Sequence, residues 1–306
     1  DLRESPLESL NWQTYEGITI KPYYTREDTQ RLPFTQQKPG ESPFLRGSIG
    51  SDNNWQNIQK IKALGNGKPA IDKATDALTR GADGVLFILE DPLAFDVAYL
   101  AESIDLTSQS VSYTLSSDPA AFLKRLHISL SEQNISHLNL KGFLNYDPMS
   151  GKGQLSKTEN KTITQVLELT KDSPDFYGVT VCGTNFSSIG ASLTQEIAYT
   201  LSAAVAYTDR LTTAGVPLES VLRNMLFCMG AGTNYFFEIA KLRALRLLWA
   251  TVVEAYQAEP ALAAKLRIHS TTSSWYQTTL DPYVNMLRVT TGAMAAVLSG
   301  AASLSV

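Results

Sequence analysis

The stretch Asn224-Met-Leu-Phe-Cys-Met-Gly-Ala-Gly-Thr-Asn-Tyr-Phe-Phe-Glu-Ile-Ala-Lys-Leu-Arg-Ala-Leu-Arg-Leu-Leu-Trp-Ala250 contains three successive patterns. Residues 224–228 form a short apolar run, which is typical of a buried strand. The glycines of Gly230-Ala-Gly232 favour a tight turn, and the apolar spacing from Tyr235 onward is that of a helix. A strand, a turn and a helix in this order predict one β–α unit of a parallel sheet.

The same rhythm extends in both directions along the chain. We predict strands at 55–61, 84–89, 110–115, 137–141, 177–182, 224–228, 266–270 and 301–306, and helices at 69–80, 92–104, 119–133, 158–171, 191–214, 233–257 and 281–298. Asp118, before Pro119, and Thr158 are the expected N-caps of two of these helices. Eight strands alternating with helices predict an α/β fold, the (β/α)8 TIM barrel, with an open doubly wound sheet as the alternative.

Residues 1–54 differ in composition and in hydrophobic periodicity from the rest of the chain. They are rich in proline, glycine, arginine and aromatic residues and show no sustained helical or strand period. This segment is predicted to be an extended N-terminal arm that packs on another surface, followed by a barrel over residues 55–306. Because the sequence begins at Asp1, without methionine, we expect it to be part of a longer chain.

Composition narrows the class of protein. A net charge of -4 and a pI near 5.5 give no general attraction for nucleic acid or an anionic membrane, so neither is an expected partner. No apolar run reaches the roughly 18 residues of a membrane span, and the charged start is unlike a signal peptide. Cys182 and Cys228 lie in apolar segments, which favours buried free thiols and a cytoplasmic location.

Few residues suggest chemistry by themselves. His127, His137 and His269 lack partners at metal-ligand spacing, so no metal site is predicted, and buried hydrogen-bonding histidines are the ordinary interpretation. His269, expected at the end of a strand, is the best functional candidate of the three. Glu238 and Lys241 are spaced to form an ion pair on one helix, which is predicted to be a buried helix of the outer ring.

Several blocks resemble one enzyme family. Residues Gly232–Ala250 resemble the pattern G-x-N-x-F-x-E-I-A-K-x-R-A-x-R-x-L-W-A of acyl-CoA mutases that use adenosylcobalamin. Further similar blocks follow the family's order: Ile189–Leu201, His269–Trp275, Asp281–Asn285 and Gly292–Gly300. These blocks cover roughly the last 120 residues, and together they are specific to the methylmalonyl-CoA mutase family. The resemblance implies a barrel and a link to the isomerisation of methylmalonyl-CoA and succinyl-CoA, a reaction of propionate metabolism.

The chain departs from the family pattern at positions that the resemblance assigns to the active site. Lys60 replaces a tyrosine, Asn185 a histidine, and Asn145 and Thr271 replace glutamines. No catalytic residue is therefore expected in this chain. The family's cobalamin-binding domain, with its D-x-H-x-x-G motif, should follow the barrel and is not in this chain, so adenosylcobalamin is expected in a partner subunit.

A retained scaffold with replaced contact residues resembles the small, non-catalytic subunit of a heterodimeric mutase, whose implied role is to stabilise a homologous catalytic large subunit. The alternative is an active acyl-CoA mutase with altered acyl specificity, in which Lys60, Asn145 and Asn185 form a rebuilt pocket. An unrelated barrel enzyme is a third reading. Residual acyl-CoA binding stays open, and a barrel interior plugged by Phe143, Tyr146 or Phe186 would argue against it.

Overall fold

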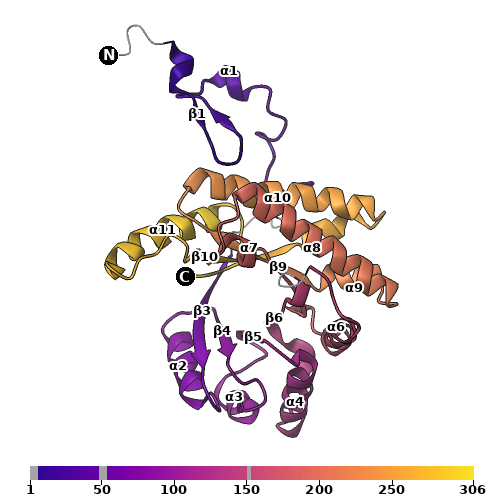
Figure 1. The fold of residues 1–306 in the computed structure, drawn as a ribbon. Helices are drawn as coiled ribbons and strands as arrows, with labels where there is room; N and C mark the ends of the chain where they lie inside the picture. Colours follow the sequence, from indigo (N-terminus) through magenta and orange to yellow (C-terminus); the bar gives the residue numbers. More distant parts are fainter. Residues whose placement is uncertain (1–5, 48–53, 150–152) are drawn as a thin grey trace.

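A parallel sheet curls into a barrel at the centre of the computed structural model, which describes residues 6–47, 54–149 and 153–306 (Figure 1). The strand order is β7-β6-β5-β4-β3-β11-β10-β9-β8, and every neighbouring pair is parallel. The strands are β3 (Gln56–Ala63), β4 (Gly84–Leu89), β5 (Ser110–Thr114), β6 (Lys141–Asn145), β7 (Asp175–Tyr177), β8 (Val179–Cys182), β9 (Met225–Ala231), β10 (Arg267–Thr272) and β11 (Ser303–Ser305).

The two ends of this order belong to one extended stretch of chain. β7 pairs with β6 and β8 pairs with β9, and only Gly178 separates β7 from β8. A Cβ atom at Gly178 would lie 2.8 Å from Val166 Cγ1 and 2.9 Å from Thr170 Oγ1, so the missing side chain lets helix α6 approach the break. The sheet therefore closes through eight strand positions. The predicted (β/α)8 barrel is confirmed, and the open sheet is excluded.

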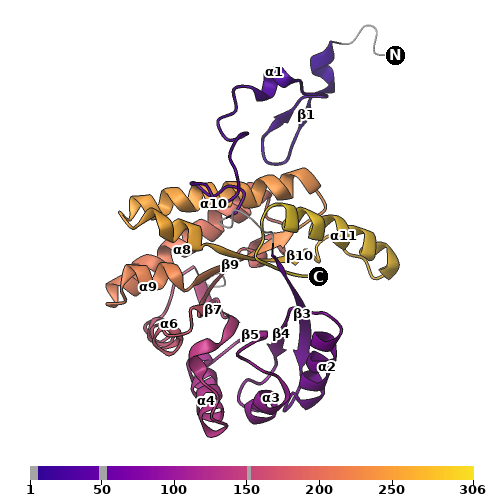
Figure 2. The same ribbon diagram turned by 180° about the vertical axis from the view of Figure 1, so that it is seen from behind.

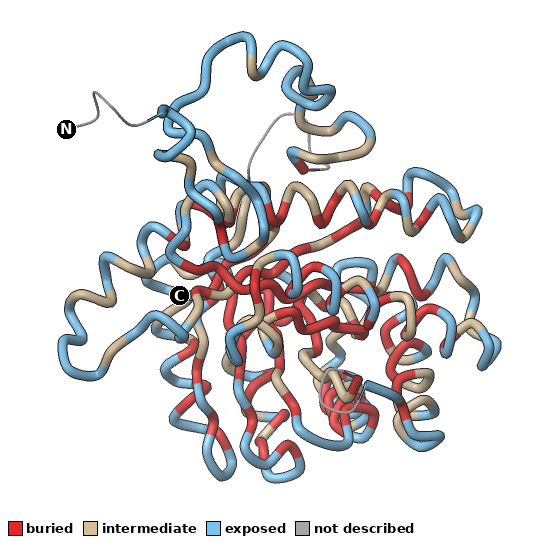
Figure 3. The backbone as a smooth tube through the Cα atoms, turned by 45° about the horizontal axis from the view of Figure 1, so that its top comes forward, coloured by how far each residue is buried: buried red, intermediate tan, exposed pale blue. Residues whose placement is uncertain are grey.

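Helices surround the barrel, as Figure 2 shows from behind. They are α2 (Lys68–Thr79), α3 (Val97–Ser103), α4 (Pro119–Glu132), α6 (Lys157–Thr170), α7 (Thr184–Ser187), α8 (Leu193–Thr213), α9 (Leu218–Arg223), α10 (Tyr235–Ala255) and α11 (Pro282–Leu298), with 3-10 turns η3 (His137–Asn139) and η4 (Pro260–Lys265). Figure 3 shows burial concentrated on the strands and on the inward faces of the helices. Within the described part of the chain, none of the helices is long and apolar enough to cross a membrane.

Two local predictions are wrong, and a third is confirmed without its expected hydrogen bond. The strand expected at 137–141 is the turn η3, stabilised because the Ser136 side chain accepts a hydrogen bond from the Leu138 amide, and β6 begins only at Lys141. The N-cap of α6 is Ser156, which forms a capping box with Glu159, in place of Thr158. Asp118 is the N-cap residue of α4, as predicted. Its backbone is left-handed (φ 45°), and its side chain accepts no capping hydrogen bond.

The segment before β3 lies mostly outside the barrel. It contains η2 (Leu7–Leu10), the short hairpin of β1 (Trp12–Gln13) and β2 (Thr19–Ile20), and α1 (Arg26–Thr29), and it stands beyond α10 in both Figure 1 and Figure 2. Trp12 stacks on Phe237 of α10 with ring centroids 6.0 Å apart. This contact brings the hairpin beside the carboxyl ends of the barrel strands, where β–α proteins form their sites.

Candidate functional site

Side chains from opposite strands meet inside the barrel. Along β3, Ile61 packs in the outer core whereas Ile58 belongs to the interior cluster, so strand alternation places Lys60 on the interior side. Asn145 of β6 donates through Nδ2 to Thr114 Oγ1 at 3.2 Å and accepts from Cys182 Sγ at 2.9 Å. Thr271 of β10 lies on the same side, with its Oγ1 3.4 Å from Nε2 of the buried His269. The fold therefore places three of the four positions that the family pattern singled out on the interior side of the barrel.

Asn185 lies apart from the other three. β8 ends at Cys182 and the chain turns at once into α7, which leaves Asn185 exposed on that short helix. Its backbone carbonyl accepts a hydrogen bond from Ser188 Oγ at 3.3 Å. This hydrogen bond does not connect Asn185 to Lys60, Asn145 or Thr271.

His269 lies inside the barrel, in the third position of β10 and beneath Thr271. It is 1% exposed, its Nδ1 is 2.8 Å from Ser303 Oγ, and its Nε2 is 3.4 Å from Thr271 Oγ1. Its ring packs on Phe143 with centroids 4.8 Å apart. Burial, helped by the positive charge of Lys60, lowers the pKa of His269 to about 3, so the imidazole is neutral at physiological pH.

The charge of Lys60 can be tested through His269. Lys60→Met is expected to raise the pKa of His269, because a nearby positive charge disappears, but to leave it below the ordinary 6.5, because burial persists. NMR titration of the histidine ring resonances measures this pKa. Lys62→Met removes the same charge from an exposed position on the same strand and should have the smaller effect. An unchanged His269 pKa in Lys60→Met would contradict this placement of Lys60.

A layer of apolar side chains closes the barrel below these polar groups. It consists of Ile58, Leu86, Phe143, Cys182, Leu226 and Cys228. Of the three aromatic residues proposed as plugs, Phe143 lies in this layer. Tyr146 packs against the outer core, and Phe186 packs on Tyr199 of α8 with centroids 5.3 Å apart. Phe143 thus provides the plug, and both cysteines are buried free thiols as predicted.

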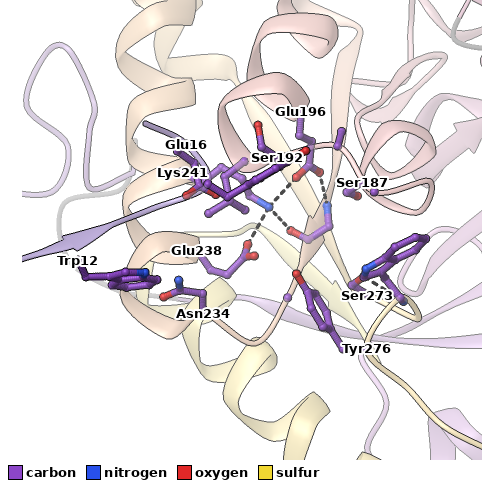
Figure 4. A pocket seen from close by; sticks show the side chains of 17 residues that line it. Trp12, Glu16, Ser187, Ser192, Glu196, Asn234, Glu238, Lys241, Ser273 and Tyr276 are labelled. Atoms are coloured by element: carbon purple, nitrogen blue, oxygen red, sulfur yellow. Dashed lines mark hydrogen bonds and ion pairs between the residues drawn. The ribbon is translucent and has the colours of Figure 1, made fainter. Parts of the chain in front are cut away.

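A second site lies beside the barrel, between α8, α10 and the N-terminal hairpin (Figure 4). It is a pocket of about 350 Å³. At its base Lys241 Nζ lies 2.7 Å from Glu196 Oε2, 2.7 Å from Glu238 Oε2 and 2.7 Å from the Gly230 carbonyl oxygen. Glu196 also accepts a hydrogen bond from the Gly230 amide at 2.8 Å. We call Glu196, Glu238 and Lys241 the Lys241 cluster.

The Lys241 cluster is a buried group of charges. The three residues are between 1% and 4% exposed. Burial raises the pKa of Glu238 even though Lys241 opposes this shift. Burial alone would lower the pKa of Lys241, but the two carboxylates outweigh it and the pKa is raised, so Lys241 stays charged. The cluster ties α8 and α10 to the end of β9.

The Glu238–Lys241 pair was predicted from its spacing on one helix, and α10 is the buried outer-ring helix expected there. Glu196 was missed, because it comes from α8, far away in the sequence. The signal that could have indicated it is a glutamate in the first turn of α8, directly before Ile197, since a glutamate that helix packing buries needs a cation.

Residues 91–306 match the family model described as methylmalonyl-CoA mutase. The chain belongs to the methylmalonyl-CoA mutase family. Among its relatives, the methylmalonyl-CoA mutase small subunit of Porphyromonas gingivalis is 34% identical over 100% of this chain and 51% of its own length. Human mitochondrial methylmalonyl-CoA mutase is 31% identical over 97% of this chain and 44% of its own. This mutase-family chain spans about half the length of the curated relatives it matches.

Among solved structures, dihydropteroate synthase (DHPS) of Yersinia pestis aligns over 83% of this chain and 88% of its own, with a TM-score of 0.47 and 15% sequence identity. The barrel of the mutase-family chain is defined by its own strand pairing, and nothing about its function is taken from this likeness.

Proposed function

We propose that this chain is the non-catalytic small subunit of a heterodimeric, adenosylcobalamin-dependent methylmalonyl-CoA mutase, where it stabilises a homologous catalytic large subunit. The observation that carries the proposal is the barrel interior. Lys60, Asn145 and Thr271 stand where the family pattern has a tyrosine and two glutamines, above a layer that Phe143 plugs. The match of the whole chain to about half of a protein named a small subunit supports the same role.

The chemistry of the family makes this replacement significant. Adenosylcobalamin, when bound, supplies the carbon radical, and the protein must orient and polarise the acyl group. Removing one such polar contact costs a factor on the order of 10² to 10³ in rate. In this chain the interior histidine is neutral and bonded to Ser303, and Asn185 is exposed on the short helix that follows β8. The tyrosine, histidine and glutamines by which the family pattern contacts the acyl group are thus all replaced in this chain.

The histidines do not fit a cobalt ligand. His127 and His137 stack on each other with ring centroids 4.6 Å apart, and η3, which holds His137, precedes β6 and so lies at the amino-terminal end of the barrel. His269 is buried in the interior. We propose that the partner subunit holds the cofactor.

We also propose a domain organisation and a cellular location for the chain. Residues 1–54 act as an arm and residues 55–306 as the barrel, with the cobalamin-binding domain outside this sequence. Two buried, unpaired cysteines support a reducing, cytoplasmic location.

Turnover and association test this function together. The purified full chain with added adenosylcobalamin is expected to show no conversion of methylmalonyl-CoA to succinyl-CoA, and to co-purify with the large subunit from its native source. The reconstituted pair should keep its activity longer on mild heating than the large subunit alone. Measurable turnover by this chain alone would overturn the proposal, and so would a large subunit that neither binds it nor gains stability from it.

The alternative is an active acyl-CoA mutase with altered acyl specificity. It is favoured by one observation: Lys60, which acts on the pKa of His269, and Asn145, which bonds to Thr114, both lie on the interior side of the barrel. Titration of the chain with a series of acyl-CoA thioesters tests it. Absence of binding to all of them would remove this alternative and any residual acyl-CoA site.

A further inference from the structure

Four polar residues form a layer at the carboxyl-terminal half of the barrel interior. We call Lys60, Thr114, Asn145 and Thr271 the upper polar layer. Each is partly exposed, whereas His269, Cys182 and Phe143 directly below are buried. Phe143 also lines a separate pocket at the amino-terminal end of the barrel, and so divides that pocket from the upper layer. A solute therefore reaches the upper polar layer from the carboxyl ends of the strands.

Lys60 brings a positive charge into this layer, and none of the other three residues of the layer carries a negative charge. Among the described residues, no carboxylate forms an ion pair with Lys60, and burial lowers the pKa of its ammonium group. Lys241, by contrast, forms ion pairs with two carboxylates. Partly desolvating an ammonium group that has no partner is unfavourable. An anion in the layer would remove this penalty.

The neighbours of Lys60 also favour an anion. Thr114 Oγ1 accepts the hydrogen bond from Asn145, which leaves the Thr114 hydroxyl hydrogen available to donate. The Asn145 amide has a second N–H, and the Lys60 ammonium has three. Donors thus come from three strands, β3, β5 and β6, and none of the four residues of the layer is acidic. Asp147, the carboxylate linked to the layer through Cys182, already accepts hydrogen bonds from the Cys182 amide and the Tyr207 hydroxyl. Two acceptor oxygens could bridge the donors of the three strands.

We propose that the upper polar layer binds a small organic monocarboxylate, with Lys60 as its counter-ion and with Thr114 and Asn145 donating to its oxygens. One positive charge balances one negative charge, whereas a dianionic phosphate would leave a negative charge uncompensated in a partly buried site. The inference goes beyond the proposed function, because a non-catalytic subunit can hold this ligand whether or not it stabilises a partner.

Acetate and acetamide test the charge requirement, because they have the same shape and differ in charge. Saturation-transfer NMR on their methyl signals, with the full chain, gives a dissociation constant for each. We expect acetate to bind in the millimolar range and about tenfold or more tighter than acetamide. Acetate should keep binding at physiological ionic strength, since a partly buried pair is weakly screened. Equal affinities, or loss of acetate binding in salt, would overturn the proposal.

Matched lysine variants locate the site. Lys60→Met should weaken acetate binding by about tenfold or more, and Lys62→Met, which removes the same charge from the exposed mouth of the same strand, should change it less than about twofold. Lys60→Met is expected to melt no lower than the wild type, because it removes an unpaired charge, so loss of binding would not reflect unfolding. Undiminished binding in Lys60→Met, or equal loss in both variants, would refute the assignment.

Discussion

Lys241→Met is expected to lower the free energy of unfolding by about 3–5 kcal/mol, because it leaves Glu196 and Glu238 as buried carboxylates without a cation. The Gly230 carbonyl would lose its hydrogen bond as well. Methionine matches the length of the lysine stem, so the change tests charge more than volume. Equilibrium unfolding in urea, followed by circular dichroism, measures the difference.

Lys171→Met is the matched control. Lys171 forms an ion pair with Glu168 at the same i,i+3 spacing as Glu238 and Lys241, but both of its side chains are exposed. Exposed pairs contribute about 0–1 kcal/mol, so this variant should unfold nearly as the wild type does. The triple variant Glu196→Gln, Glu238→Gln, Lys241→Met, which removes all three charges, should recover part of the loss. Similar losses in Lys241→Met and Lys171→Met would contradict the buried character of the cluster.

Acid should destabilise the protein through His269. In the unfolded chain this histidine takes up a proton near its ordinary pKa of 6.5, and in the folded protein only near about 3. The stability it confers is therefore complete above pH 6.5 and is lost progressively as the pH falls toward 3. The gap between these pKa values corresponds to about 5 kcal/mol. Urea unfolding at a series of pH values between these limits measures the loss.

His269→Gln isolates this contribution, because glutamine can bond to Ser303 without titrating. It should be less stable than the wild type at neutral pH, where its packing on Phe143 is poorer, yet lose less stability on acidification. His137→Gln, at a half-buried site outside the barrel, should keep most of the wild-type acid sensitivity. If the wild type and His269→Gln lose stability in parallel between pH 6.5 and 3, the buried neutral histidine is not the cause.

Prediction from the sequence succeeded where the signal is local. The apolar run 84–89 matches β4, because a strand buried on both faces reads as an uninterrupted hydrophobic stretch. It failed at 137–141, where alternating apolar residues look like a strand but Ser136 nucleates a 3-10 turn. Here the local hydrogen bond of one side chain decided against the periodic pattern.

Local sequence signals likewise predicted some residues of the candidate sites and missed others. The spacing of Glu238 and Lys241 on one helix predicted their ion pair, and the block alignment indicated the positions of Lys60, Asn145 and Thr271. Glu196 and Ser303 could not be assigned in advance, since each meets its partner across distant parts of the chain. The exposure of Asn185 also depends on how the chain turns after β8.

The sequence by itself determined the alternation of strands and helices and membership of the mutase family, because periodicity and motif spacing are properties of neighbouring residues. Only the tertiary structure decided that the barrel closes through a strand broken at Gly178, that Glu196 shares Lys241 with Glu238, and that Lys60 stands inside the barrel without a described carboxylate partner. The physical reason is that closure and charge pairing depend on which elements lie side by side, and packing sets this across the whole chain.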